Sequence, residues 1–157
     1  MNQRSDIVTQ RKRSEMMAAV SQEDTPPEMA VRSILTSLGC RYRVRNRDLL
    51  GSPDIANRTR GWAVFVHGCF WHGHNNCPHT RSGRDFRVPA SNAEFWREKL
   101  ETNRLRDARA ITSLLARDFV VALVWECELK NPKAVADRLA MLIPSSDESP
   151  SGGGGST

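Results

Sequence analysis

The histidines and half of the cysteines gather in one short stretch of this 157-residue chain. All four histidines and two of the four cysteines lie between residues 67 and 79: His67, Cys69, His72, His74, Cys77 and His79. A structural core does not require imidazole and thiol groups at this density. Two kinds of chemistry do, namely metal ligation and proton transfer near neutral pH.

Cys69, His74 and Cys77 follow the spacing Cys-x4-His-x2-Cys, which offers three zinc ligands on one loop. Zinc prefers a tetrahedral set of thiolate and imidazole ligands, so a fourth residue is needed. His79 is an alternative to His74 in this set. The clustering with histidine favours metal in a reducing compartment over two disulfides, and a cluster without metal is a further alternative.

Cys127 is the candidate for the fourth zinc ligand. It follows an apolar run at residues 119–125, which predicts a strand, and we expect that strand beside another at residues 62–66. A site completed in this way fastens a long loop to the sheet and leaves no open coordination position, so the zinc is expected to be structural. Cys40 is distant in the sequence and is expected to be a small buried hydrophobic residue.

A second chemical pattern connects Asp54 with His67. Asp54 follows Gly-Ser-Pro and leads into a predicted strand, while His67 follows the strand at residues 62–66. An acid at the start of one strand and a group at the end of its neighbour can hold a magnesium ion between them. Such an ion polarises a phosphate and orients a water, which is the chemistry of a nuclease. A Pro-Asp pair on its own is more often a turn.

The elements that position these groups can be predicted from periodicity and from capping residues. Asp24–Glu28 begins a helix that Gly39 ends, and the alternation at residues 40–47 predicts a half-exposed strand with a basic outer face. The other predicted elements are a turn and strand at 49–56, a strand at 62–66, a loop at 78–89, a helix from Ser91 or Asn92 to about Arg117, a fully buried strand at 119–125 and a helix at 133–143. This order predicts an α/β domain whose mixed sheet, with a three-stranded meander, is flanked by helices.

Charge and length limit the class of protein. The formal net charge is +5 and the pI is about 9.4, which suits a polyanionic partner, nucleic acid before membrane. No apolar run reaches the ~18 residues of a membrane span. We expect a flexible basic arm at 1–13, one domain at 14–143 and a flexible Gly/Ser-rich tail at 144–157. Residues 14–20 are either a small packed helix or part of an arm that closes over DNA.

A set of short motifs extends over most of the chain, and the most specific is His67-Gly-Cys-Phe-Trp-His72. The others are Arg13-Ser14, Met17, Asp24-Thr25, Glu28, Gly51-x-Pro53-Asp54, Phe65, Pro89-Ala90, Glu94-Phe95-Trp96, Asn103, Arg106-Asp107 and Val124-Trp125-Glu126-Cys127. Together they resemble the very short patch repair endonucleases, which are similar to restriction enzymes of the PD-(D/E)xK fold. The resemblance covers about residues 11 to 142 and implies a restriction-endonuclease-like fold with a structural zinc site.

The resemblance implies an endonuclease that recognises a T:G mismatch, which arises when 5-methylcytosine deaminates. It implies nicking of the thymine-bearing strand on its 5′ side, with magnesium as the catalytic metal and double-stranded DNA as the partner. We expect a bacterial cytoplasmic monomer, and mismatch-repair proteins stay open as further partners. Two alternatives remain: a related zinc-containing endonuclease of the same fold with a different DNA target, and a zinc module that only binds DNA.

The resemblance also implies roles for five residues near the proposed magnesium site. Asp54 would be the metal-binding acid, and Val66 would contribute its backbone carbonyl, although the family pattern has threonine at that position. His67 resembles the residue that replaces the lysine of the wider fold. His72 resembles a general base or acid acting on the attacking water, which suits an unperturbed pKa of ~6.5. Glu28 would be a carboxylate that faces this pair; otherwise it is a favourable first-turn residue.

Three aromatic residues resemble a wedge that enters the base stack beside the mismatch: Phe70, Trp71 and Trp96. Inserting rings costs less where pairing is imperfect, because a mismatched step unstacks more easily. A core role is the alternative for each, most clearly for Trp96, which shares a helical face with Leu100, Ile111 and Leu114. In the same resemblance, the family's structural zinc ligands match Cys69, His74, Cys77 and Cys127.

Overall fold

The computed structural model of the chain describes residues 23–69, 74, 77 and 91–143. Its elements are α2 (Pro26–Ser37), β1 (Arg43–Val44), β2 (Ile55–Asn57), β3 (Trp62–His67), α3 (Ala93–Ala116), β4 (Val120–Trp125), the 3-10 helix η1 (Glu126–Lys130) and α4 (Pro132–Leu142). The predicted α/β class and the predicted order of elements are confirmed. Within the described ranges, no helix is long and apolar enough to cross a membrane. The expected arm at 1–13 and tail at 144–157 lie outside the described residues.

The four strands form one mixed sheet in the order β1-β2-β3-β4. β1, β2 and β3 are antiparallel neighbours, so the predicted meander is confirmed. β4 returns after the long helix α3 and lies parallel to β3, with His67 opposite Trp125 at the end of the pairing. Because parallel strands end at the same edge of a sheet, the segments that follow β3 and β4 begin side by side.

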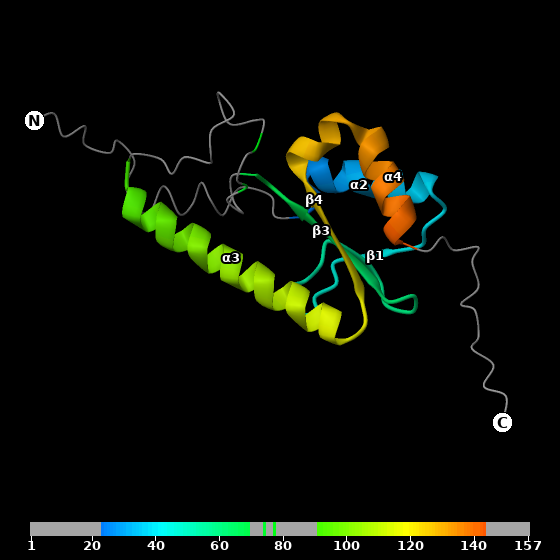
Figure 1. Cartoon of the computed structure of the whole chain (residues 1–157), viewed down its shortest axis with the longest axis horizontal. Coiled ribbons are helices and arrows are strands. Elements are labelled where there is room, and N and C mark those ends of the chain that lie inside the picture. Colours follow the sequence, from blue (N-terminus) through cyan, green and yellow to red (C-terminus); the bar gives the residue numbers. More distant parts are fainter. Residues whose placement is uncertain (1–22, 70–73, 75–76, 78–90, 144–157) are drawn as a thin grey trace, which may run out of the picture.

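Helices cover both faces of the sheet (Figure 1). The face toward α2 and α4 buries Val31, Leu35, Cys40, Ile55, Trp62, Val64, Ala122, Val124, Val135, Leu139 and Ile143. The face toward α3 buries Leu49, Ala56, Ala63, Phe65, Ala110 and Leu114. Successive residues of a strand point to opposite faces, and β3 follows that rule with Trp62 and Val64 on one side and Ala63 and Phe65 on the other. Cys40 is the buried small residue that the sequence predicts.

α2 begins as its sequence predicts. The Thr25 hydroxyl accepts a hydrogen bond from the Glu28 N–H at 3.4 Å, and Pro26 and Pro27 occupy the first turn, where a missing N–H costs nothing. The helix ends at Ser37, and the chain turns at Gly39, whose φ of 74° is accessible to glycine without strain. Thr25 therefore fixes the start of α2 and, with it, the position of Glu28.

Two strand predictions need correction. The strand expected at 40–47 is only Arg43–Val44, because Arg45 turns to a φ of 56° and the buried Asn46 amide donates to the carbonyls of Arg43 and Pro53. The strand at 119–125 is not fully buried. β4 lies at an edge of the described sheet, and Val120 is 38% exposed.

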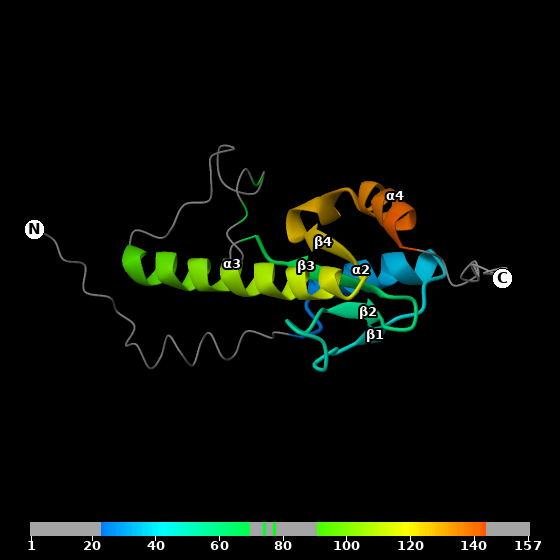
Figure 2. The same ribbon diagram turned by 60° about the horizontal axis from the view of Figure 1, so that its bottom comes forward.

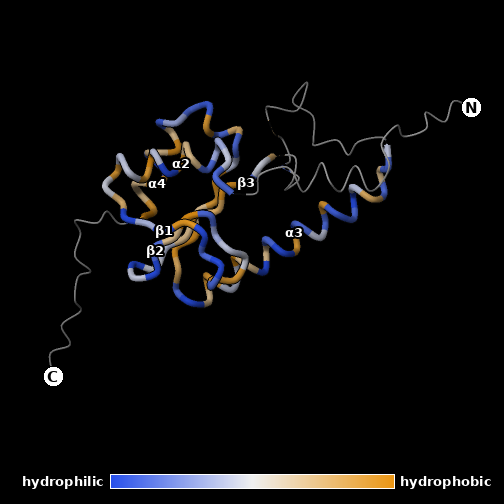
Figure 3. Tube along the Cα trace, turned by 180° about the vertical axis from the view of Figure 1, so that it is seen from behind, coloured by the Kyte–Doolittle hydropathy of each residue, from blue (hydrophilic) through white to orange (hydrophobic). Residues whose placement is uncertain are grey.

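α3 reaches far beyond the sheet at its amino-terminal end (Figure 2). Of its expected apolar face, Leu100 and Leu114 are buried, whereas Trp96 and Ile111 are only partly covered. Hydrophobic positions concentrate at the sheet, while α3 alternates hydrophilic and hydrophobic positions along its length (Figure 3). Asn92 stands at the helix start as expected, but its side chain makes no capping hydrogen bond and its φ is 61°.

Candidate active site and metal centre

Cys69, His74, Cys77 and Cys127 come together just beyond the ends of β3 and β4. One ligand atom from each lies within 4.8 Å of the others, and the Cys127 Sγ is 3.4 Å from His74 Nδ1. A tetrahedral zinc site with Zn–S bonds of ~2.3 Å and Zn–N bonds of ~2.0 Å needs ligand–ligand separations of roughly 3.5–3.8 Å. The four side chains therefore fit a metal such as zinc with little adjustment. The alternative ligand His79 lies outside the described residues.

Contacts from η1 and from β4 hold this Cys3His group in place. The Cys69 N–H donates to Glu126 Oε1 at 3.2 Å, and the His74 N–H donates to the Cys69 carbonyl at 2.9 Å. The His74 ring stacks on Trp125, with centroids 4.1 Å apart and planes 4° from parallel. The last residue of β4 thus supports a ligand from the loop after β3, so the group joins two segments that are far apart in sequence.

Burial shapes the chemistry of the three thiols. All three cysteine residues of the group are at least 93% buried. That burial, reinforced by the neighbouring Cys77 and Cys127 thiols, raises the pKa of Cys69 to about 12. Burial also raises the pKa of Cys127. Thiols in this environment stay protonated near neutral pH unless a cation compensates the thiolate charge, which is what a bound metal does.

Asp54 lies beside the carboxyl-terminal part of β3. Its Oδ2 accepts a hydrogen bond from the Val66 N–H at 2.7 Å. The turn before it is fixed on two sides, because the Asn46 amide holds the Pro53 carbonyl and Gly51 meets Ala110 of α3 where a Cβ would collide. Gly51 has a φ of 78°, so glycine is required there for conformation as well as for space. The position of the Asp54 carboxylate is thus set by the fold.

His67 is the last residue of β3 and is 96% buried. Strand alternation puts it on the α3 face, where its Nε2 lies 4.0 Å from Asp107 Oδ1. Its ring packs edge-on against Trp125, with centroids 5.3 Å apart, and near Phe65 at 6.0 Å. Asp54 and His67 are therefore both placed by the final residues of β3, one through a backbone N–H and the other as part of the strand.

Asp107 is the site residue that reasoning from chemical types missed. It lies in the Arg106-Asp107 motif of the family resemblance, but no chemical role was attached to it. The signal was its helical spacing, because Asp107, Ala110 and Leu114 recur at i, i+3 and i+7 on the sheet-facing side of α3. A carboxylate on an otherwise apolar face needs a polar partner, and His67 supplies one.

Glu28 is buried at the start of α2, which packs on β3 and η1. Its Oε2 accepts from the Asp24 N–H at 3.0 Å and lies 3.4 Å from Arg32 Nη2. Arg32 in turn pairs with the Asp24 carboxylate at 2.8 Å. These bonds connect Glu28 to its own helix start and to the residues just before it, so the expectation that Glu28 faces Asp54 and His67 stays a prediction.

The aromatic candidates divide between described and undescribed residues. Trp96 lies on the part of α3 that reaches past the sheet, half-buried, with its ring 5.4 Å from that of Phe95. It belongs to neither of the two buried clusters of the sheet faces. His72, Phe70 and Trp71 lie outside the described residues, although the stretch that holds them runs between the ligands Cys69 and His74.

The family described as DNA mismatch endonuclease Vsr matches residues 5–78 of the chain. The type II nicking enzyme V.XorIIP of Xanthomonas oryzae pv. oryzae is 41% identical, over 88% of this chain and 97% of that protein. The type II nicking enzyme V.NmeAIP of Neisseria meningitidis is 41% identical, over 88% and 94%. The DNA mismatch endonuclease Vsr of Escherichia coli is 37% identical, over 85% of this chain and 81% of its own length.

The residues matched by the family include Asp54, His67 and three of the four grouped metal ligands, Cys69, His74 and Cys77. The relatives extend that match across β4 and η1, and η1 supplies the fourth ligand, since each relative covers more than four fifths of the chain. The chain therefore belongs to the DNA mismatch endonuclease Vsr family and is a DNA endonuclease, a hydrolase.

Proposed function

We propose that this endonuclease recognises a T:G mismatch in duplex DNA and nicks the thymine-bearing strand on its 5′ side. The observation that carries the proposal is the juxtaposition of Asp54 with the last residues of β3, just before the Cys3His group. The mismatch specificity is supported by the Escherichia coli relative, which is named a DNA mismatch endonuclease and is 37% identical.

Asp54 and the Val66 carbonyl are the proposed ligands of a magnesium ion. Within a strand, the N–H and the C=O of one residue point to the same side, and the Val66 N–H points to Asp54. The Val66 carbonyl therefore points to the same side of β3 as the Asp54 carboxylate. At this level the neighbouring segment has not yet entered β2, which begins at Ile55. When bound, magnesium supplies Lewis-acid polarisation of the scissile phosphate. Valine supplies this carbonyl as well as threonine does.

His67 and His72 are the proposed proton-handling residues. The position of Asp107 Oδ1, 4.0 Å from His67 Nε2, suits a carboxylate that orients the imidazole and tightens on it when substrate binds. His67 then presents its other side to the phosphate that Asp54 also approaches. His72 is the proposed general base or acid on the attacking water, a role that rests on the family resemblance and on its place five residues after His67.

The Cys3His group is proposed to hold a structural zinc. All four ligands come from the protein, so no position is left for water or substrate. The group instead fixes both ends of the stretch 70–73, which contains Phe70, Trp71 and His72. A wedge and a proposed base in one short tethered segment would move together, which would make nicking depend on whether the base stack yields.

The decisive experiment is nicking of labelled duplexes that differ at one base pair. A T:G duplex should be nicked in magnesium and left intact in excess chelator, while T:A and C:G duplexes are nicked far more slowly. Labelling each strand separately should show the break only in the thymine strand, on its 5′ side. Equal nicking of all three duplexes would refute the mismatch specificity, while the endonuclease itself would stand.

Trp71→Ala tests the wedge. It should reduce T:G nicking much more than it reduces binding to a fully paired duplex, with a modest change in thermal stability. If Trp71 is instead a core residue, unfolding should cost about 3–5 kcal/mol less and the folded fraction should nick normally. His79→Ala is a useful control on the same stretch, because it should alter neither metal content nor nicking if His74 is the ligand.

A further inference from the structure

A hollow of about 620 Å³ opens far from the proposed nicking centre. Its floor is Ala56 of β2, which belongs to the buried cluster on the α3 face of the sheet. Its walls come from β1, from the turn between β2 and β3, and from the segment that joins α3 to β4. That turn and that segment meet at the amino-terminal end of β3, whereas Asp54 contacts Val66 near the other end.

The hollow exists because α3 covers only part of its face of the sheet. α3 ends at Ala116 beside β4, and the described residues place no other helix over the same face of β1 and β2. Arg43 stands directly opposite Ala56 in the register of β1 and β2, so it shares that uncovered face. Ala56, a small residue, and Arg43, a long cation, therefore occupy positions that would hold an apolar pair if a helix packed over them.

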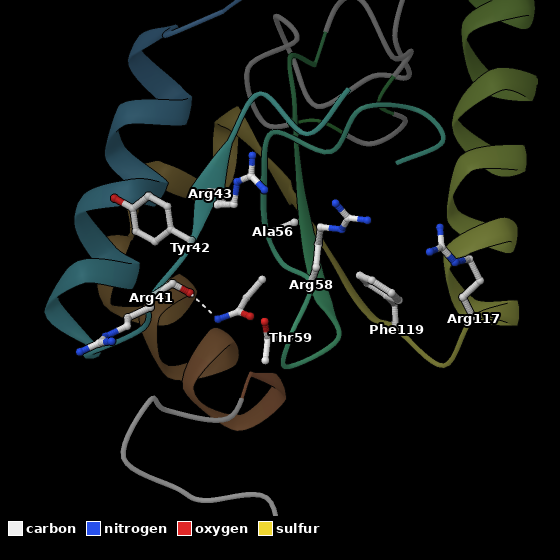
Figure 4. Close-up of a pocket in the computed structure, with 9 residues that line it drawn as sticks. Arg41, Tyr42, Arg43, Ala56, Arg58, Thr59, Arg117 and Phe119 are labelled. Carbon is white, nitrogen blue, oxygen red and sulfur yellow. Dashed lines mark hydrogen bonds between the residues drawn. The ribbon is translucent and has the colours of Figure 1, made fainter. Parts of the chain in front are cut away.

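The lining is strongly cationic. Its described residues include four arginines and no carboxylate, and the arginines are Arg41, Arg43, Arg58 and Arg117. Figure 4 shows the side chains of Arg43, Arg58 and Arg117 in a row across the opening, while Arg41 points away from it. Arg58 also pairs with Asp48 outside the lining, and Arg117 lies over the Phe119 ring at 5.6 Å.

A row of guanidinium groups matches a ligand with repeated negative charges. Guanidinium binds phosphate through paired hydrogen bonds, and several in a row suit a sugar–phosphate backbone better than one compact anion. We propose that this arginine pocket, lined by Arg43, Arg58 and Arg117, binds backbone phosphates of the DNA flanking the nick. The proposal rests on the proposed function in one respect only, that the flanking DNA belongs to the duplex that is nicked.

The dimensions of β3 set the distance between the two sites. Its six residues rise about 3.3 Å each, so the ends of the strand lie roughly 17 Å apart. Duplex DNA rises 3.4 Å per base pair, and the pocket would meet phosphates roughly five base pairs from the nick if the duplex follows the strand. A duplex with short arms, meaning few base pairs on either side of the mismatch, would end before it reaches the pocket.

The test measures binding by fluorescence anisotropy on two T:G hairpin duplexes, one with arms of ~4 base pairs and one with arms of ~12. Arg43→Ala/Arg117→Ala should bind the long duplex about 10-fold more weakly than the parent protein and the short duplex almost equally well. The slope of log K against log salt on the long duplex should fall by about 2, one unit for each lost phosphate contact.

Lys130→Ala/Lys133→Ala is the matched control, because it removes the same charge from exposed positions outside the pocket. Its effect on binding should be the same for the duplex with short arms and for the duplex with long arms. Equal losses on both duplexes, or a loss matched by the control, would overturn the proposal in favour of a general charge effect. Unchanged binding to both would also overturn it and would point to an acidic protein segment. If the parent protein nicks T:G and T:A duplexes alike, the proposed function fails while the dependence on arm length still decides this inference.

Discussion

Two centres flank the carboxyl-terminal end of β3, and they are built by opposite means. The Cys3His group uses buried sulfur and imidazole, with all four ligand atoms already within 4.8 Å of one another. The Asp54 centre uses oxygen groups, and its carboxylate accepts a hydrogen bond from a backbone N–H of the neighbouring strand. One group offers a complete set of four ligands, and the other offers a carboxylate beside the end of the strand.

Under the proposed function, the difference matches what each centre would do. A structural metal contributes to folding, so burial and a complete ligand set are advantages. A catalytic centre must admit a phosphate and a water, so its groups are held by the fold and cannot be satisfied wholly by one another. The two proposed centres can share one strand end because β3 ends between Asp54 on its β2 side and Trp125 on its β4 side.

The largest effect is expected when the Asp54 centre loses the negative charge of its carboxylate. Asp54→Asn should lower T:G nicking by about 10³-fold or more, which corresponds to ~4 kcal/mol of transition-state stabilisation. Binding to duplex should change little, because arginine contacts to phosphates dominate affinity. Single-turnover nicking and anisotropy on the same protein measure the two effects, with Asp137→Asn, an exposed side chain of α4, as the control. A variant that nicks at the parent rate would remove Asp54 from the mechanism.

Loss of a ligand from the Cys3His group should instead act on metal binding and on the stability of the fold. Cys127→Ser should lose the bound metal and destabilise the fold by roughly 3 kcal/mol or more, a fraction of the ~10–16 kcal/mol that zinc supplies to zinc-finger peptides. Cys40→Ser offers a matched control, because Cys40 is also a buried thiol but lies outside the Cys3His group. Metal analysis and thermal unfolding should find metal retained in the control. An intact fold without zinc would contradict a structural metal.

Asp107→Asn should have an intermediate effect. Groups that orient a reacting side chain typically contribute 10- to 100-fold, so nicking should fall by about that factor with little change in melting temperature. Because the lost charge faces His67 Nε2, the pH–rate profile should also shift, which a purely structural role would not produce. Asp118→Asn is the control, an exposed aspartate just beyond the same helix. An unchanged profile would assign Asp107 to packing alone.

How much of these centres could be read from sequence depends on the range of the interactions. The Cys3His set follows from ligand types, from spacing and from the expected neighbourhood of two apolar strands, so all four members could be named beforehand. The contact between His67 and Asp107 depends on the register of α3 across the sheet. Spacing identifies which helix face packs inward, but it does not say which strand residue that face meets.

The two strand predictions were each wrong in one respect, for different reasons. The alternation at 40–47 is real, because Tyr42 packs against the cluster on the α2 face and Val44 stands opposite Ile55 of that cluster. The pairing ends where the Asn46 side chain replaces a ladder bond. The apolar run at 119–125 is typical of a central strand, yet β4 lies at an edge of the described sheet. An apolar run of this kind indicates that both faces of a strand pack against helices. It does not indicate whether the strand has one or two neighbouring strands in the sheet.

The smallest effect concerns the contacts around Glu28. Asp24→Asn removes the ion pairs of Asp24 with Arg32 and Arg45, but it keeps the backbone N–H that Glu28 accepts from. Asparagine also tolerates the φ of 57° at this position. The melting temperature should fall slightly, far less than in Cys127→Ser, and nicking should fall less than in Asp107→Asn.

The pH dependence of this difference has a definite sign. The hydrogen bond from Arg32 lowers the pKa of Asp24, so the pair stabilises the fold above the ordinary carboxyl pKa of ~4 and loses that effect as pH falls through the lowered value. Parent and Asp24→Asn should therefore differ in melting temperature at pH 7 and converge as pH falls below about 4. They should also converge at ~1 M salt, because exposed pairs are screened. A difference that persists in acid and in salt would mean that Asp24 acts through packing.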